Sequence, residues 1–132
     1  MTPHETEIRT TIENWAAAVR AKDMDGIMAD HAADMVMFDV PEPLQSLGLE
    51  AYRATWDLFF RYSDGGPNSF NLTELKITAG DTVAFATAIL TIFGSALRLT
   101  VGLRKEGGRW LIAHEHHSYA AKLDDQPATD GP

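Results

Sequence analysis

Apolar residues recur at every third or fourth position in three stretches of the chain, which is the spacing of one buried face of an α-helix. This pattern predicts a first helix over residues 6–21, with the apolar stripe Ile8, Ile12, Trp15 and Val19. Asp23 is a suitable N-cap for a short second helix, with the stripe Met24, Ile27, Met28 and His31. A third helix is predicted over residues 49–62, with the stripe Leu49, Tyr52, Trp56, Phe59 and Phe60.

Alternating residues, the spacing of a strand, mark the rest of the chain. Residues 35–40 form the first predicted strand, with Met35, Met37 and Asp39 on one face and a stop at Pro41. After a turn rich in Gly, Asp and Ser, only strands are predicted: residues 70–78, 83–93, 97–105 and 109–119. The order indicates an α+β fold, with three N-terminal helices in the hollow of a curved, mostly antiparallel sheet. A cone-shaped cavity is expected to open at one end.

The final strand carries three of the chain's five histidines. Side chains alternate across a strand, so one face holds Trp110, Ile112, His114, His116 and Ser118. The other face holds Leu111, Ala113, Glu115, His117 and Tyr119. Each face begins apolar and becomes polar, as expected where a strand leaves a core and enters a cavity or an interface. The residues leave open which face is turned inward, and whether the histidines are only solvated.

Two polar residues stand in otherwise apolar stripes. His31 shares its stripe with methionines, where a histidine is either a hydrogen-bonded core residue or a catalytic group. Asp39 closes a strand face of methionines, where a partly buried carboxylate would suit a general base. An exposed aspartate that only caps the proline-rich turn would be inert. Both alternatives stay open at this point.

Composition and charge narrow the classes of function. The chain has 132 residues, of which 45% are hydrophobic and 23% charged, as expected for one globular domain over residues 1–121. A net charge of −8 argues against nucleic acid and anionic membranes as partners. Without cysteine, the chain has no disulfide framework, thiolate nucleophile or Cys-type zinc site. No signal peptide is visible, so a cytoplasmic location is expected; residues 122–132 are expected to form a flexible tail.

Three segments carry a resemblance to a known family. They are Lys22-Asp23-Met24-Asp25-Gly26-Ile27, the Ala32-Ala33-Asp34 step into the first strand, and the closing Arg109-Trp110-Leu111-Ile112 with its histidines. Together with the order of elements, they resemble the NTF2-like superfamily, in its SnoaL-like and ketosteroid-isomerase-like group, over residues 5–120. This superfamily includes isomerases, cyclases, dehydratases, hydrolases and non-catalytic assembly domains, so the resemblance implies a fold but no single reaction.

The resemblance also implies positions for site residues. It places Asp39 where ketosteroid isomerases have their catalytic base. Trp15 and Val101 stand where those isomerases have their two oxyanion-hole donors, so a steroid isomerase of the known kind is not expected. The cavity would be lined from the last strand by Ala113, Glu115 and His117, with His31 and Trp56 as further lining residues. The outer face, where relatives form dimers, would hold Trp110, Ile112, His114 and His116.

These positions favour general acid–base catalysis without a cofactor. Asp39 would take a proton, and His117 or His31 would donate one. Glu115 would orient or tune His117. The expected substrate is a small, mostly apolar organic molecule, and its predicted binding residues are Trp15, Trp56, Met35, Met37, Leu99, Val101 and Ala113.

Two alternatives accompany this hypothesis. A metal site is the weaker one, because His114 and His116 point the same way but onto the expected dimer face; no metal is predicted. The stronger one is a non-catalytic domain that binds a small ligand or assembles through a homodimer. The strand over residues 83–93 is apolar on both faces, which suggests that helices cover one side and a second subunit the other.

Overall fold

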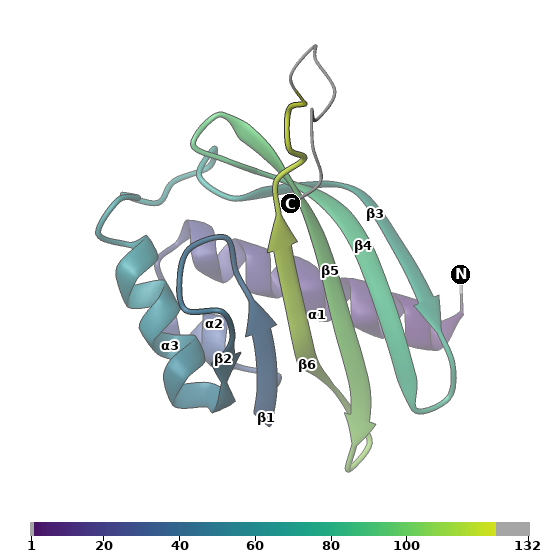
Figure 1. Cartoon of the computed structure of the whole chain (residues 1–132). Helices are drawn as coiled ribbons and strands as arrows, with labels where there is room; N and C mark the ends of the chain where they lie inside the picture. The colour runs from purple at the N-terminus through teal and green to yellow at the C-terminus, as the bar shows by residue number, and fades with distance from the viewer. Residues whose placement is uncertain (1, 124–132) are drawn as a thin grey trace, which may run out of the picture.

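Helices cover the concave side of one curved sheet in the computed structural model, which describes residues 2–123 (Figure 1). The helices are α1 (Pro3–Arg20), α2 (Met24–Met28) and α3 (Gly48–Phe59). The strands are β1 (His31–Phe38), β2 (Ser46–Leu47), β3 (Asn71–Ala79), β4 (Val83–Ile92), β5 (Ser95–Glu106) and β6 (Arg109–Ser118). The predicted α+β fold, with three N-terminal helices in the hollow of a curved and mostly antiparallel sheet, is confirmed.

The strand order is β2-β1-β6-β5-β4-β3. All neighbouring strands run antiparallel except β1 and β6, which run parallel. This parallel pair sets Met37 beside Glu115 and Phe38 beside His116. Asp39, the residue after β1, therefore reaches the level of His117. The two-residue strand β2, which was not predicted, adds an edge beside β1.

Local sequence explains where the first two helices begin. Thr2 caps α1 by accepting a hydrogen bond from the backbone N–H of Glu5, and Pro3 occupies the first turn, where its missing N–H costs nothing. The predicted cap of the second helix is confirmed, because the Asp23 side chain accepts from the N–H of Gly26 at 3.2 Å. The stripe predicted for the first helix is buried in full: Ile8, Ile12, Trp15 and Val19.

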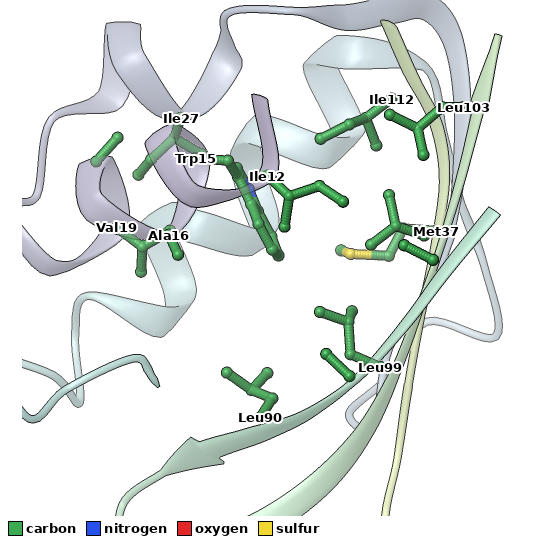
Figure 2. Packing of buried hydrophobic residues seen from close by; sticks show 14 of the residues in the cluster. Ile12, Trp15, Ala16, Val19, Ile27, Met37, Leu90, Leu99, Leu103 and Ile112 are labelled. Atoms are coloured by element: carbon green, nitrogen blue, oxygen red, sulfur yellow. The ribbon is translucent and has the colours of Figure 1, made fainter. Parts of the chain in front are cut away.

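The hydrophobic core lies between these helices and the sheet. Figure 2 shows Ile12 and Trp15 of α1 facing side chains from the strands, among them Met37, Leu99 and Ile112. The stripe of α3 adds Tyr52 and Trp56, which are also buried. Packing of α1 and α3 against β1, β5 and β6 thus fixes where the polar ends of these strands lie.

The prediction that His31 lies on the second helix is wrong. That helix ends at Met28, and Asp30 adopts a left-handed backbone conformation with φ 56° that redirects the chain. The carbonyl of Asp30 accepts a hydrogen bond from the N–H of Ile112 at 2.7 Å. His31 is therefore the first residue of β1, and the strand begins four residues earlier than its alternation indicated.

The predicted facing of the last strand is wrong in its first half. β6 pairs with β5 through Leu103 and Ile112, then through Gly102 and His114, so Ala113 is an extra residue that forms a β-bulge. Before this bulge, Trp110 and Ile112 are buried on the inner face rather than lying on the outer one. Trp110 contacts His4 of α1, with 5.4 Å between the ring centroids.

Beyond the bulge, the predicted facing agrees with the structure. Glu115 and His117 are buried on the inner face, whereas His114 and His116 contact Phe38 on the outer face. Ala113, which was predicted to line the cavity, is half-buried, packs against the edge of the core and lines neither part of the pocket described below. A single inserted residue therefore allows one strand to supply apolar residues to the core at one end and polar residues at the other.

Two further points concern the C-terminal tail and membrane-spanning helices. The predicted flexible tail over residues 122–132 lies outside the described residues from residue 124 onwards. No helix within residues 2–123 is long and apolar enough to cross a membrane.

The burial of Ile112 predicts the effect of truncating it. Ile112→Ala should lower the free energy of unfolding by about 2–5 kcal/mol, because the side chain has 0% exposure and its removal leaves a cavity. Urea denaturation measures this quantity. Val83→Ala, on the exposed side of β4, is the matched control and should cost less than about 0.5 kcal/mol. Equal costs for the two variants would contradict the inward facing of Ile112.

Candidate functional site

A buried carboxylate, Glu115 on β6, lies at the centre of the polar residues on the inner face. Its Oε2 accepts a hydrogen bond from the Tyr52 hydroxyl at 2.5 Å and lies 2.9 Å from Nε2 of His31. Its Oε1 lies 3.2 Å from Nε2 of His117. Glu115 is fully buried. Three donors from β1, α3 and β6 therefore surround one carboxylate that has no contact with solvent.

The Tyr52 hydroxyl links this carboxylate to the helices. It accepts a hydrogen bond from Nε1 of Trp15 at 3.0 Å and donates its own proton to Glu115. Burial, followed by the negative charge of Glu115, raises the pKa of Tyr52 well above its ordinary value. Tyr52 therefore keeps its proton and serves as a fixed donor.

Both ring nitrogens of His31 face oxygen acceptors. Its Nδ1 donates to the carbonyl of Ala29 at 3.0 Å, and its Nε2 lies against Glu115. The ring also packs against Tyr52, with centroids 4.6 Å apart. His31 therefore contacts Glu115 from the core side with both of its ring nitrogens engaged.

His117 differs from His31 because only one of its nitrogens is held. Nε2 contacts Glu115, while Nδ1 lies 3.7 Å from Oδ1 of Asp39, beyond hydrogen-bond distance. Burial alone would lower the pKa of His117, but the hydrogen bond to Glu115 and the charges of Glu115 and Asp39 raise it above its ordinary value. His117 thus has one hydrogen-bonded ring nitrogen, and its other ring nitrogen lies beside a second carboxylate, that of Asp39.

The same contacts keep Glu115 ionised. Burial alone would raise the pKa of Glu115. Hydrogen bonds from His117 and His31, together with the positive charges of these rings, outweigh burial and lower the pKa to about 2. Glu115 therefore holds a negative charge across the physiological range.

Asp39 and His117 line a pocket with two chambers. The outer chamber has a volume of about 370 Å³. Its apolar lining includes Val40, Leu58, Phe59, Ile92, Phe93 and Leu97, and its polar lining includes Asp39, Glu42, Ser46, Thr55, Tyr62 and Tyr119. The inner chamber has a volume of about 40 Å³ and is lined by Met37, Asp39, Thr55, Trp56, Phe59, Phe70, Ile92 and His117. Because Asp39, Thr55, Phe59 and Ile92 line both, the chambers adjoin.

The structure brings some of the predicted site residues together at this pocket. Asp39, His117, Met37 and Trp56 line the inner chamber, and Glu115 lies behind His117. The other predicted residues line neither chamber: His31, Trp15, Met35, Leu99, Val101 and Ala113. Leu99 and Val101 instead pack in the core as the β5 partners of His117 and Glu115. Trp15 reaches the site only through Tyr52.

Sequence reasoning assigned Tyr52 to the helix stripe and missed its hydrogen bonds. A tyrosine inside a buried stripe usually has a partner for its hydroxyl, and that expectation could have identified it. The outer-chamber residues Glu42, Phe93 and Tyr119 were also missed, because loop residues far apart in the sequence form this lining. Alternation and helical spacing carry no information about such loops.

A metal site has no support from side-chain geometry in the described part of the chain. Among residues 2–123, no group of three or more His, Asp or Glu side chains is arranged to hold a metal ion. His114 donates from Nδ1 to the carbonyl of Val36 at 2.7 Å, on the outer face of the sheet. The two outer histidines thus belong to the surface of the sheet and not to the pocket.

A sequence model of the SnoaL-like domain matches residues 8–122. The chain belongs to the SnoaL-like domain family. The resemblance predicted from the sequence is thereby confirmed. A search of curated proteins found no match to this SnoaL-like domain.

Solved structures similar to this SnoaL-like domain share its fold. An NTF2-like protein of unknown function from Pseudomonas putida KT2440 is 35% identical, with a TM-score of 0.84 over 100% of this chain and 99% of that one. A ketosteroid isomerase-like protein from Erwinia carotovora atroseptica is 17% identical, with a TM-score of 0.72 over 92% and 100% of the two chains. A protein with a cystatin-like fold from Nostoc punctiforme is 15% identical, with a TM-score of 0.75 over 89% and 92%. The last two show a likeness of fold alone.

The Glu115 contacts predict how stability depends on pH. Because the pKa of Glu115 is lowered from 4.5 to about 2, its stabilising contribution is present above pH 4.5 and is lost as the pH falls towards 2. The contribution of His117, whose pKa is raised, is present below its ordinary value of 6.5 and is lost as the pH rises through the raised value. Urea unfolding of the SnoaL-like domain at several pH values should show both losses.

Glu115→Gln tests this assignment directly. At neutral pH it should cost about 3–5 kcal/mol of unfolding free energy, because it removes one partner from buried charges. The variant should also lose less stability than the wild type between pH 4.5 and 2. Glu50→Gln, an exposed change on α3, is the control and should keep the wild-type pH dependence. An unchanged acid profile in Glu115→Gln would refute the lowered pKa.

Tyr52→Phe tests how much the Tyr52 hydroxyl, which joins Trp15 to Glu115, contributes to stability. The change removes the donor to Glu115 and the acceptor of Trp15 Nε1, and should cost about 1–3 kcal/mol of unfolding free energy. Tyr62→Phe removes the hydroxyl of an exposed tyrosine and serves as the control, with an expected cost near zero. Similar unfolding free energies for the two variants would contradict a structural role for the Tyr52 hydroxyl.

Proposed function

We propose that this SnoaL-like domain is a general acid–base enzyme that moves a proton on a small, mostly apolar organic molecule without a cofactor. The observation that supports this most is the pairing of Asp39 with His117 at the inner chamber, with 3.7 Å between Oδ1 and Nδ1. A carboxylate and an imidazole at that separation can both contact one small group of a bound substrate. The proposed reaction is of the isomerase, lyase or dehydratase, or cyclase type.

Glu115 prepares His117 for this role. When Nε2–H of His117 donates to Glu115, Nδ1 is left free to exchange a proton at the chamber. The negative charge of Glu115 raises the pKa of His117 and thereby favours the form that carries a proton on Nδ1. Glu115 therefore acts as a positioning residue, because it works through His117 and does not touch the substrate.

The proposed reaction begins with two coupled proton movements. Asp39 takes a proton from the carbon beside a carbonyl group, and the electron pair of the broken C–H bond forms the new C=C bond. His117 donates its Nδ1 proton to the carbonyl oxygen, which gives a neutral enol. With an unsaturated ketone the enol is a dienol: protonated Asp39 returns its proton to the far carbon of the dienol, His117 takes back the enol O–H proton as the C=O bond re-forms, and the result is an isomerisation. With a hydroxyl on the next carbon, protonated Asp39 gives its proton to that hydroxyl, which leaves as water while His117 takes back the enol O–H proton, and the result is a dehydration. His31 takes no part in these steps, because both of its nitrogens are engaged in the core.

A non-catalytic domain that binds a small ligand, or assembles as a homodimer, is the second candidate. The outer face of the sheet supports it, because this face exposes large apolar side chains beside His114 and His116. Phe38 is 36% exposed, Phe85 51% and Val83 63%. A second copy of the chain would cover this face in the proposed homodimer.

Proton exchange distinguishes the two candidates. Cyclohexyl methyl ketone is a suitable probe, because it is small, apolar and carries protons beside a carbonyl. The wild type should accelerate exchange of these protons into D₂O, followed by NMR, and Asp39→Asn should lower the rate by at least about 100-fold. The rate should also fall as the pH rises through the raised pKa of His117, since the proton donor is then lost.

Asp57→Asn is the matched control, because Asp57 is exposed on α3 and lines neither chamber. It should exchange the ketone protons at nearly the wild-type rate. Exchange no faster than in buffer, although the ketone binds, would reject the enzyme and favour the non-catalytic candidate. An Asp39→Asn variant with full activity would reject the role of Asp39.

A further inference from the structure

The two chambers differ in size by enough to separate two parts of a substrate. The inner chamber, of about 40 Å³, holds about one or two water-sized groups and no ring. The outer chamber, of about 370 Å³, falls within the usual range of small-molecule sites. Only the end of a bound molecule can therefore reach His117, while its body stays in the outer chamber.

The groups at the inner chamber define what this end can be. His117 Nδ1 and the Asp39 carboxylate lie there, whereas the hydroxyl of Thr55 already donates to the backbone carbonyl of Tyr52 at 2.6 Å. A neutral oxygen group can accept a hydrogen bond from His117 and lie beside Asp39 without repulsion. A carboxylate in the same place would put a second negative charge next to Asp39.

The outer chamber has carboxylates but no balancing cation. Asp39 and Glu42 line it, and neither chamber is lined by Lys or Arg of the described residues. Arg98 is tied to the Ser118 hydroxyl and the Tyr119 carbonyl and is exposed, and Arg61 is exposed beside Tyr62. The charge inside the pocket is therefore negative except at His117.

The body of the substrate meets an apolar and partly exposed surface. Several of the chain's exposed large apolar side chains gather at this one pocket: Val40, Leu58, Tyr62, Phe93 and Tyr119. Contact with an uncharged apolar body would remove this surface from water. A strongly hydrated ionic body would gain nothing from it and would be repelled by Glu42 if negative.

We infer that the pocket prefers molecules that have an apolar body and one neutral oxygen group at the end over their anionic analogues, and that Glu42 is a specificity-determining residue that rejects those analogues. The apolar body fills the outer chamber, and the oxygen enters the inner chamber beside His117. This inference rests on the proposed function for the position of the reacting end. The preference for neutral over anionic molecules is a difference in binding affinity, so it can be measured without any catalytic activity.

A matched series of probes tests the inference. Cyclohexylmethanol, cyclohexylmethylamine and cyclohexanecarboxylate share one apolar body and differ in the charge of the end group. Binding can be followed by tryptophan fluorescence, because Trp56 lines the inner chamber. The alcohol should bind the wild type about ten-fold more tightly than the carboxylate at low salt. The amine should also bind more tightly than the carboxylate, because Asp39 and Glu42 attract its positive charge.

Substitutions at Glu42 distinguish the effect of its own charge on binding from the effect of the net negative charge of the chain. Glu42→Gln should strengthen binding of the carboxylate by about two- to five-fold, and Glu42→Lys by more, with little change for the alcohol. Glu7→Gln changes the net charge equally on an exposed part of α1 that lines neither chamber. It should leave all three affinities unchanged.

The possible outcomes are distinct. Carboxylate binding as tight as alcohol binding in the wild type would overturn the inference, as would failure of the alcohol to bind at millimolar concentration. An effect of Glu7→Gln equal to that of Glu42→Gln would overturn the role of Glu42. A preserved charge preference with no ketone proton exchange would support the inference while rejecting catalysis, so the two proposals fail separately.

Discussion

The fold depends on the ionised carboxylate of Glu115 in a place that water does not reach. An unpaired charge there would be strongly destabilising. Three donors from different elements, Tyr52, His31 and His117, compensate for the lost hydration. Because the donors come from α3, β1 and β6, the carboxylate also joins the helical layer to the first and last strands. The same hydrogen bonds that compensate the charge of Glu115 also fix the relative positions of these elements. A shift of any one of them would leave a buried polar group without its partner.

The two histidines that contact Glu115, His31 and His117, differ in how their second ring nitrogen is used. His31 uses one nitrogen for Glu115 and the other for the carbonyl of Ala29, so it is fully engaged by the core. His117 uses one nitrogen for Glu115 and turns the other towards Asp39 and the inner chamber. The hydrogen bond between Nε2–H of His117 and Glu115 can therefore persist while Nδ1 exchanges a proton on the chamber side.

Much of the fold, and part of the site, could be predicted from residue spacing. Alternation put Asp39 on the same strand face as Met35 and Met37, and the family resemblance predicted that this face is turned inward. Helical spacing identified the stripes of α1 and α3. The bulge at Ala113 could not be predicted, because one inserted residue reverses the facing of Trp110 and Ile112 without changing the composition of the strand. His31 was assigned to a helix since the left-handed turn at Asp30 has no glycine or proline to mark it.

The parts of the pocket differ in how strongly the fold constrains them. Asp39 and His117 are positioned by the parallel pairing of β1 and β6 and by the contact with Glu115, so their places follow from the core. The outer chamber is formed largely by residues beyond the ends of strands and helices, among them Glu42, Tyr62, Phe93 and Tyr119. Substitutions there alter volume and charge without disturbing a buried hydrogen bond. The residues that transfer protons, Asp39 and His117, are therefore structurally separate from the residues that select the substrate. A change of substrate within this fold requires no change at Glu115, the carboxylate that joins its elements.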